Sequence, residues 1–207
     1  MTSSVAPISK PNVLVDLLPT RILPGARVRT ATLVVGGALL VALASQVKIP
    51  LGFTPVPING LTFATLIVGA SLGARRGAAA LSLFWVLGVI GLPFFQAGNS
   101  GWTYATGATG GYLVGSVLAA AVVGAVADRG GDRRVLTSVA TMVTVNVVLI
   151  WGLGTLWLSH VLGVPVFGGA KSAFALGIQP FIAGDIFKVL LAGLLLPAAW
   201  SGVKRWS

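Results

Sequence analysis

The sequence predicts an all-α, polytopic membrane protein with six transmembrane helices. Hydrophobic residues occupy 56% of the 207 positions, and charged residues occupy only 9%. The charges fall in short clusters, which leave uncharged stretches at 30–47, 49–74, 77–127 and 135–159 and a last apolar stretch interrupted only by Asp185 and Lys188. Because a bilayer core needs about 20 apolar residues per helix, the stretch 77–127 must hold two spans and each of the others one.

The six spans form one transmembrane domain, which we place at residues 28–203. The helices are expected near residues 28–46, 59–74, 77–92, 108–127, 135–159 and 178–201. Residues 1–27 precede the domain and residues 204–207 follow it. The first segment lacks the compact apolar region and small-residue cleavage site of a signal peptide, so we expect it to be retained. Its residues Val13–Leu23 could lie amphipathically on the inner leaflet or form a flexible tail.

The distribution of lysine and arginine predicts that both termini are cytoplasmic. Six spans put the two termini on one side of the membrane, and short cytoplasmic loops are enriched in Lys and Arg. The side of the termini carries eleven basic residues: Lys10, Arg21, Arg27, Arg29, Arg75, Arg76, Arg129, Arg133, Arg134, Lys204 and Arg205. The opposite side carries only Lys48 and Lys171. This topology in the cell membrane, with contact to membrane lipid, explains the net charge of +10 without a nucleic-acid partner.

The first span contains two alanines, Ala38 and Ala42, that share one helix face. Small residues at this spacing let membrane helices approach closely. The face could therefore dock another subunit, or it could pack within the protein's own bundle.

Two segments on the outer side are rich in groups that could contact a ligand. Residues 48–59 contain three prolines, which forbid a continuous helix and suggest a lid. Residues 93–112 are the densest polar and aromatic stretch of the chain, with Asn99, Trp102, Tyr104 and Tyr112. Asn99 suits a polar ligand because its amide both donates and accepts, although it could equally form a turn. Trp102 and Tyr104 could belong instead to an aromatic belt at the membrane interface.

Asp185 and Lys188 are a charged pair inside the sixth span, in a chain with four Asp and no Glu. Each charge costs about 2.5–3.5 kcal/mol near the bilayer centre on insertion scales, so such residues tend to line a ligand or ion path. At about 1.5 Å per residue, the pair lies roughly 8–12 Å below the outer end of the helix. Residues three apart share a helix face, so the pair could instead neutralise itself without binding anything.

The residue inventory argues against an enzyme. The chain has no cysteine, no glutamate and a single histidine, so thiolate metal sites, histidine metal clusters and the usual intramembrane hydrolase groups cannot be assembled. No phosphate-binding loop is present, so uphill transport would need ATP hydrolysis by another subunit. We expect no cofactor or metal. One carboxylate, one ammonium, amides and aromatic rings suit a small, partly apolar and anionic solute.

Five collinear motifs resemble those of the BioY family, the biotin-specific substrate-binding (S) components of energy-coupling factor (ECF) transporters. They are Val-Pro-Ile-Asn-Gly-Leu-Thr-Phe at 56–63, Gly-Ala-Arg-Arg-Gly at 73–77, Gly-Leu-Pro-Phe at 91–94, Gly-Ala-Thr-Gly-Gly-Tyr-Leu at 107–113 and Pro-Phe-Ile-Ala-Gly-Asp-Ile-Phe-Lys at 180–188. The sequence departs from the family at Leu61, where many members have Gln, and this puts a polar contact there in doubt.

The resemblance implies the ECF S-component fold, a biotin pocket near the outer face, and a partner module of one transmembrane coupling protein with two ATPase subunits. It assigns biotin contacts to Asp185 and Lys188 and, through a less certain alignment, to Asn99. Ala38 and Ala42 are similar to the residues that dock on the coupling protein. An S component for a different vitamin, an autonomous biotin transporter and a structural membrane subunit remain as alternatives.

Biotin matches the chemistry of these residues. Its ureido N–H groups suit Asp185, its ureido oxygen suits the Asn99 amide, and its carboxylate suits Lys188. Its bicyclic ring suits aromatic side chains, for which the candidates are Trp102, Tyr104 and Tyr112.

Overall fold

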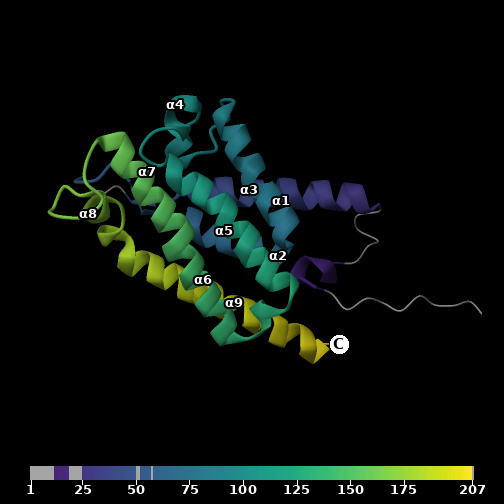
Figure 1. Ribbon diagram of the computed structural model, residues 1–207. Coiled ribbons are helices and arrows are strands. Elements are labelled where there is room, and N and C mark those ends of the chain that lie inside the picture. The colour runs from purple at the N-terminus through teal and green to yellow at the C-terminus, as the bar shows by residue number, and fades with distance from the viewer. Residues whose placement is uncertain (1–11, 19–24, 50–51, 57, 207) are drawn as a thin grey trace, which may run out of the picture.

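Six long helical segments form a bundle in the computed structural model, which describes residues 12–18, 25–49, 52–56 and 58–206 (Figure 1). The segments are α1 (Ala26–Gln46), α2 (Leu61–Leu72), α3 (Ala74–Val89), α5 (Gly110–Asp128), a continuous helix made of α6 (Val135–Val145), the π-helical η4 (Asn146–Trp151) and α7 (Gly152–Leu162), and α9 (Ile182–Trp206). Each overlaps one of the six predicted spans, so the all-α prediction is confirmed.

Short elements connect these helices. They are η1 (Leu14–Leu17), β1 (Lys48–Ile49), β2 (Ile58–Asn59), η2 (Gln96–Gly98), α4 (Trp102–Ala105), η3 (Gly131–Arg133), α8 (Ala173–Gly177) and η5 (Gln179–Phe181). The two strands pair antiparallel, with Lys48 opposite Asn59 and Ile49 opposite Ile58. The 48–59 segment is therefore not a helix where it is described, as its prolines predicted; Pro50, Leu51 and Pro57 lie outside the described residues.

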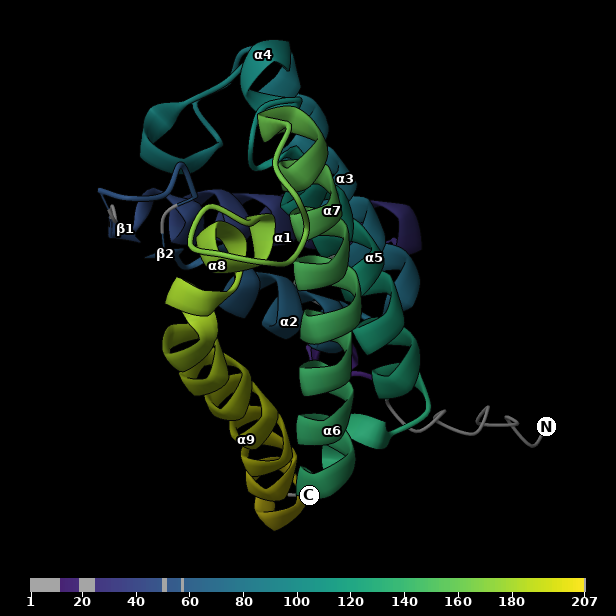
Figure 2. The same ribbon diagram turned by 60° about the vertical axis from the view of Figure 1, so that its left-hand side comes forward.

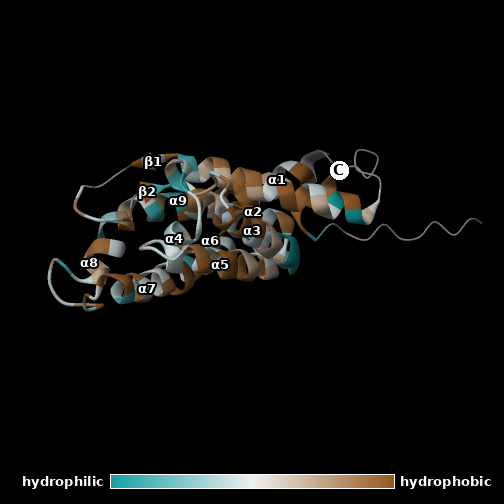
Figure 3. Cartoon of the chain, turned by 90° about the horizontal axis from the view of Figure 1, so that it is seen from above, coloured by the Kyte–Doolittle hydropathy of each residue, from teal (hydrophilic) through white to brown (hydrophobic). Residues whose placement is uncertain are grey.

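The chain is a multi-pass membrane protein. Among the described residues, four helical stretches are long and apolar enough to cross a bilayer: Ala26–Gln46, Gly110–Asp128, Val135–Leu162 and Ala173–Val203. Helix α2 is a shorter apolar helix. Hydrophobic residues dominate the helix surfaces, and hydrophilic residues gather toward the ends of the molecule (Figure 3).

The molecule has two contrasting ends (Figures 2 and 3). One, which we call the loop end, carries the β1–β2 ladder, α4 and α8. The other, which we call the basic end, carries the start of α3 with Arg75 and Arg76, the α5–α6 turn with Arg133 and Arg134, and the C-terminal end of α9.

Small residues let the helices approach closely around α5. A Cβ built on Gly69 of α2 would lie 2.7 Å from the carbonyl oxygen of Ala120 in α5. A Cβ built on Gly115 of α5 would lie 2.5 Å from the carbonyl oxygen of Leu149 in η4. Only glycine fits at these crossings, because any Cβ would lie too close to the facing carbonyl oxygen. Such close backbone packing is a main source of helix association in lipid.

Ala38 and Ala42 face the interior of the bundle. Their exposed fractions are only 1% and 7%, and α1 packs on α3 along this side. The outward face of α1 is formed by larger side chains, among them Val35, Leu39 and Leu43. Of the two interpretations of the alanine stripe, this structure supports packing within the chain's own bundle, and it leaves the two methyl groups inaccessible to another subunit.

The described part of the N-terminal segment packs against protein at the basic end. Val13 and Val15 are buried, and Asp16 forms a 3.0 Å ion pair with Arg76 in α3. Arg29 donates to the carbonyl oxygen of Val15 at 2.8 Å. For residues 12–18, this corrects the expectation of a flexible tail or a surface helix on the lipid; residues 19–24, including Arg21, lie outside the described residues.

Candidate ligand-binding site

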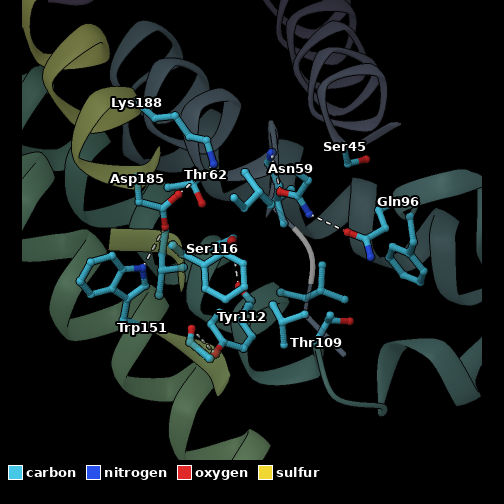
Figure 4. A pocket seen from close by; sticks show the side chains of 18 of the residues that line it. Ser45, Asn59, Thr62, Gln96, Thr109, Tyr112, Ser116, Trp151, Asp185 and Lys188 are labelled. Atoms are coloured by element: carbon cyan, nitrogen blue, oxygen red, sulfur yellow. Dashed lines mark hydrogen bonds and ion pairs between the residues drawn. The ribbon is translucent and has the colours of Figure 1, made fainter. Parts of the chain in front are cut away.

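A cavity opens at the loop end between α2, α3, α5, η4 and α9. It holds about 660 Å³ free of protein atoms, a volume that includes the space in its open mouth. Its polar side chains gather on opposite sides, with Asp185, Lys188 and Trp151 on one side and Asn59 and Gln96 on the other (Figure 4). We call these two groups the charged pole and the amide pole.

The charged pole is a buried carboxylate with both oxygens occupied. Lys188 donates from Nζ to Oδ1 of Asp185 at 2.8 Å, and Trp151 donates from Nε1 to Oδ2 at 2.9 Å. Asp185 is 6% exposed and lies in the first turn of α9, where the helix dipole favours a negative charge. The predicted pairing of Asp185 with Lys188 is present, and the pair also lines the cavity. The two interpretations of the pair are therefore compatible.

Trp151 is a functional candidate that the sequence did not reveal. It is the last residue of η4, whose π-helical backbone shifts the register of the side chains that follow. Such single π turns are rare and occur frequently at functional sites. The only sequence signal is a tryptophan within an apolar span, and its N–H needs a partner when buried.

The amide pole is built by two segments that are not long helices. Asn59 of β2 donates from Nδ2 to Oε1 of Gln96 in η2 at 2.9 Å, and its Oδ1 accepts from the backbone N–H of Leu61 at 3.0 Å. Gln96 is 9% exposed. Its Nε2 donates to no atom of the described chain, so it is available to a ligand.

Aromatic rings form the wall between the poles. Tyr104 stacks on Phe95 with ring centroids 5.2 Å apart, and Phe84 meets the same ring edge-on at 5.7 Å. Burial raises the pKa of the Tyr104 phenol, which keeps it neutral and able to donate. The Tyr112 ring also lines the cavity, while its hydroxyl donates to the carbonyl oxygen of Gly177 at 2.8 Å and so ties α5 to α8.

Two predicted site residues lie outside the cavity. Asn99 is exposed, and its Nδ2 donates to the carbonyl oxygen of Gln96 at 2.8 Å, which is the turn-forming role that its sequence context left open. Trp102 is 62% exposed and meets Trp85 edge-on, as an interfacial aromatic residue does. Gln96, three residues before Asn99, occupies the place expected for Asn99.

The segment predicted to be a lid contributes directly to the cavity. Val56, Ile58 and Asn59 line it, and Thr54 donates from Oγ1 to the carbonyl oxygen of Leu176 in α8 at 2.6 Å. Leu61 also lines the cavity, so this part of the wall is apolar.

Comparison with known proteins places the chain among transporter subunits. The sequence model described as the BioY family matches residues 16–205. The protein named biotin transporter BioY of Rhizobium etli is 35% identical over 172 residues, which cover 80% of this chain and 89% of that protein. The one of Rhodobacter capsulatus is 36% identical over 168 residues, covering 76% and 85%.

A solved structure shares the fold. It is described as the crystal structure of the S-component for biotin from an ECF-type ABC transporter, and it matches with a TM-score of 0.73 and 23% sequence identity. The match covers 84% of this chain and 92% of that one. The arrangement of six long helical segments is therefore that of an ECF S-component.

Proposed function

We propose that this chain, which belongs to the BioY family, is a membrane-embedded subunit that captures biotin and delivers it to the cytoplasm with an ECF ATPase module. The observation that carries the proposal is the charged pole: a buried carboxylate beside an ammonium group on one side of a cavity partly lined by aromatic rings, opposite an amide pole. The relatives named biotin transporters support the choice of ligand.

The charged pole suits the ureido ring of biotin. A cyclic urea presents an N–H donor directly beside a carbonyl acceptor, and Asp185 and Lys188 present an acceptor and a donor side by side at 2.8 Å. The biotin carboxylate would be repelled by Asp185 at this place. Since the two residues lie together, they contact the same end of an extended ligand, which replaces the sequence-based assignment of Lys188 to the carboxylate.

The carboxylate end of biotin then lies toward the amide pole and the mouth. The Gln96 amide offers an N–H donor there, and the rings of Phe95, Tyr104 and Tyr112 cover the bicyclic ring between the poles. In this proposal the amide that contacts biotin is that of Gln96, held by Asn59, and it meets the carboxylate end rather than the ureido oxygen that the sequence assigned to Asn99.

The subunit is non-catalytic in this proposal, and its partners are a transmembrane coupling protein and two ATPase subunits. The arginines of the basic end favour a cytoplasmic position for that end and for both termini, so the cavity opens to the outside. The small-residue stripe of Ala38 and Ala42 would reach a coupling protein only if α1 moved relative to α3.

Titration calorimetry of the purified protein tests the proposal. We expect tight biotin binding, and a loss of about 100-fold or more in Asp185→Ala, because Lys188 would be left buried without a partner. The matched control is Ile186→Ala, a neighbouring position that is 50% exposed on the outer side of α9. Tight binding of thiamin or riboflavin instead of biotin would contradict the assignment of biotin as the ligand. Biotin flux into liposomes that contain this protein alone would contradict the dependence on an ATPase module.

A further inference from the structure

A buried stripe of one helix leads from the floor of the cavity toward the basic end. Ile150 and Trp151 line the cavity, and Asn146, Met142 and Ser138 follow at intervals of four residues along the same helix face. Asn146, Met142 and Ser138 are 3%, 1% and 3% exposed, so the stripe faces the interior of the bundle throughout.

This stripe, together with Asp132 in the η3 turn that precedes its helix, carries polar atoms without protein partners. Within the described residues, Oδ1 of Asn146, Oγ of Ser138 and Oδ1 of Asp132 are buried and make no hydrogen bond. Membrane proteins satisfy nearly all such groups, because lipid offers no hydrogen bonds. Buried polar groups that lack a protein partner are typically satisfied by ordered water.

The lower part of the stripe borders a second, smaller cavity. It holds about 180 Å³ free of protein atoms, counting its mouth, and is lined by Asp132, Ser138, Thr141 and Met142 together with residues of α2 and α5. The two unpartnered oxygens of Asp132 and Ser138 thus belong to residues that line one cavity. Burial raises the pKa of Asp132, whose Oδ2 accepts a hydrogen bond from Trp200.

Two similar bonds mark the ends of the stripe. At the charged pole, Trp151 donates to Asp185 of α9 at 2.9 Å; at the basic end, Trp200 of α9 donates to Asp132 at 2.6 Å. Each bond joins α9 to the α6–α7 helix or the turn that precedes it.

We propose that the stripe from Asn146 to Asp132 forms a narrow hydrated passage that connects the floor of the ligand cavity with the basic end. Water molecules bond to Asn146, Ser138 and Asp132, and the flexible side chain of Met142 narrows the passage between Asn146 and Ser138. The passage brings water to the buried charged pole from the side opposite to the cavity mouth. The hydration of the passage does not depend on the proposed function.

The accessibility of single introduced cysteines tests this passage. No native thiol can react with the reagent, because the chain contains no cysteine. Single variants Ser138→Cys, Met142→Cys and Asn146→Cys are reconstituted in liposomes and treated with a charged, membrane-impermeant methanethiosulfonate. Val143→Cys and Val147→Cys are matched controls, since they neighbour the stripe but are 43% and 45% exposed toward the lipid. We expect the three stripe positions to react at least about tenfold faster than the controls.

Asn146 is the decisive position, because it is the stripe residue farthest from the basic end. At about 1.5 Å per residue, it lies roughly 16 Å along the helix from Val135, the first residue of α6. Reaction at Ser138→Cys alone, with Met142→Cys and Asn146→Cys as slow as the controls, would contradict a continuous passage. A lipid-soluble maleimide should label the control positions and so establish that their thiols are reactive.

A second measurement uses no thiol chemistry. If water satisfies the Asn146 oxygen, Asn146→Leu removes favourable bonds and lowers the melting temperature of the protein in detergent. If the oxygen is unsatisfied in a dry interior, the same substitution raises the melting temperature, and the proposal fails. Neither readout requires biotin, so a failure of the passage is distinguishable from a failure of the proposed ligand.

Discussion

The two poles of the cavity are built in opposite ways. The charged pole comes from two long helices, with Asp185 and Lys188 one turn apart on α9 and Trp151 on the facing η4. The amide pole comes from two short connecting segments, with Asn59 on β2 and Gln96 on η2. Positions on one helix are related by a fixed period, whereas positions in separate connections meet only through the fold. The charged pair of this pole could therefore be predicted from the sequence, whereas its Trp151 and the amide pole could not.

The two poles should also differ in how much they contribute to the affinity for the ligand. The charged pole combines a salt bridge and an indole hydrogen bond in a buried place, where unpaired charges are expensive. The amide pole contains only neutral hydrogen bonds, which are individually worth about 1 kcal/mol. We therefore expect the charged pole to dominate affinity and the amide pole to tune it.

The largest effect should come from the charged pair itself. Lys188→Ala leaves Asp185 as an unpaired buried charge and should weaken biotin binding about 100-fold or more and lower the thermal stability. The double change Asp185→Leu, Lys188→Leu removes both charges, so it should recover the stability but not the binding. Calorimetry and thermal unfolding measure the two properties separately. Wild-type affinity in the double variant would reduce the pair to a structural bridge.

A smaller effect should separate Gln96 from Asn99. Gln96→Ala removes the partner of Asn59 and an N–H donor that faces the cavity, so we expect biotin binding to weaken about tenfold. Asn99→Ala removes an exposed turn contact and should leave the affinity within about twofold of wild type. The same titration of both variants checks the assignment, and the reverse order of effects would restore Asn99 as the ligand contact.

Trp151→Phe should weaken biotin binding by about fivefold. The substitution keeps an aromatic ring but removes the N–H that holds Oδ2 of Asp185, so the carboxylate loses a fixed orientation. Trp157→Phe is the matched control, because it also removes an indole hydrogen bond, to the carbonyl oxygen of Gly107, outside the cavity lining. Equal losses in the two variants would mean that the effect is one of general stability.

The smallest effect should come from Tyr104→Phe. The ring stacked on Phe95 remains, so binding should change by no more than about twofold. Because burial raises the pKa of Tyr104, its phenol stays protonated through the neutral range and should add no pH dependence to biotin binding between about pH 6 and 8. Titrations of wild type and Tyr104→Phe across this range should run parallel; a divergence would show that the phenol ionises.

The helices themselves were largely predictable. Helices α1, α5 and α6–α7 begin within about two residues of the predicted first residues of their spans. Charge clusters and bilayer thickness together limit where a span can begin. Short elements such as α4 and α8 were not predicted, since they depend on contacts between distant segments. The bond from Tyr112 to Gly177, which joins α5 to α8, is one such contact.

By itself, the sequence determined the membrane class, the number of long helical segments and the presence of a charged pair on one helix face, because these follow from hydropathy and from a fixed helical period. Only the tertiary structure decided that Gln96 rather than Asn99 enters the cavity, that Trp151 completes the charged pole, and that Ala38 and Ala42 face inward. The reason is physical: which side of a connection or helix faces a cavity depends on neighbours that the chain brings together only when it folds.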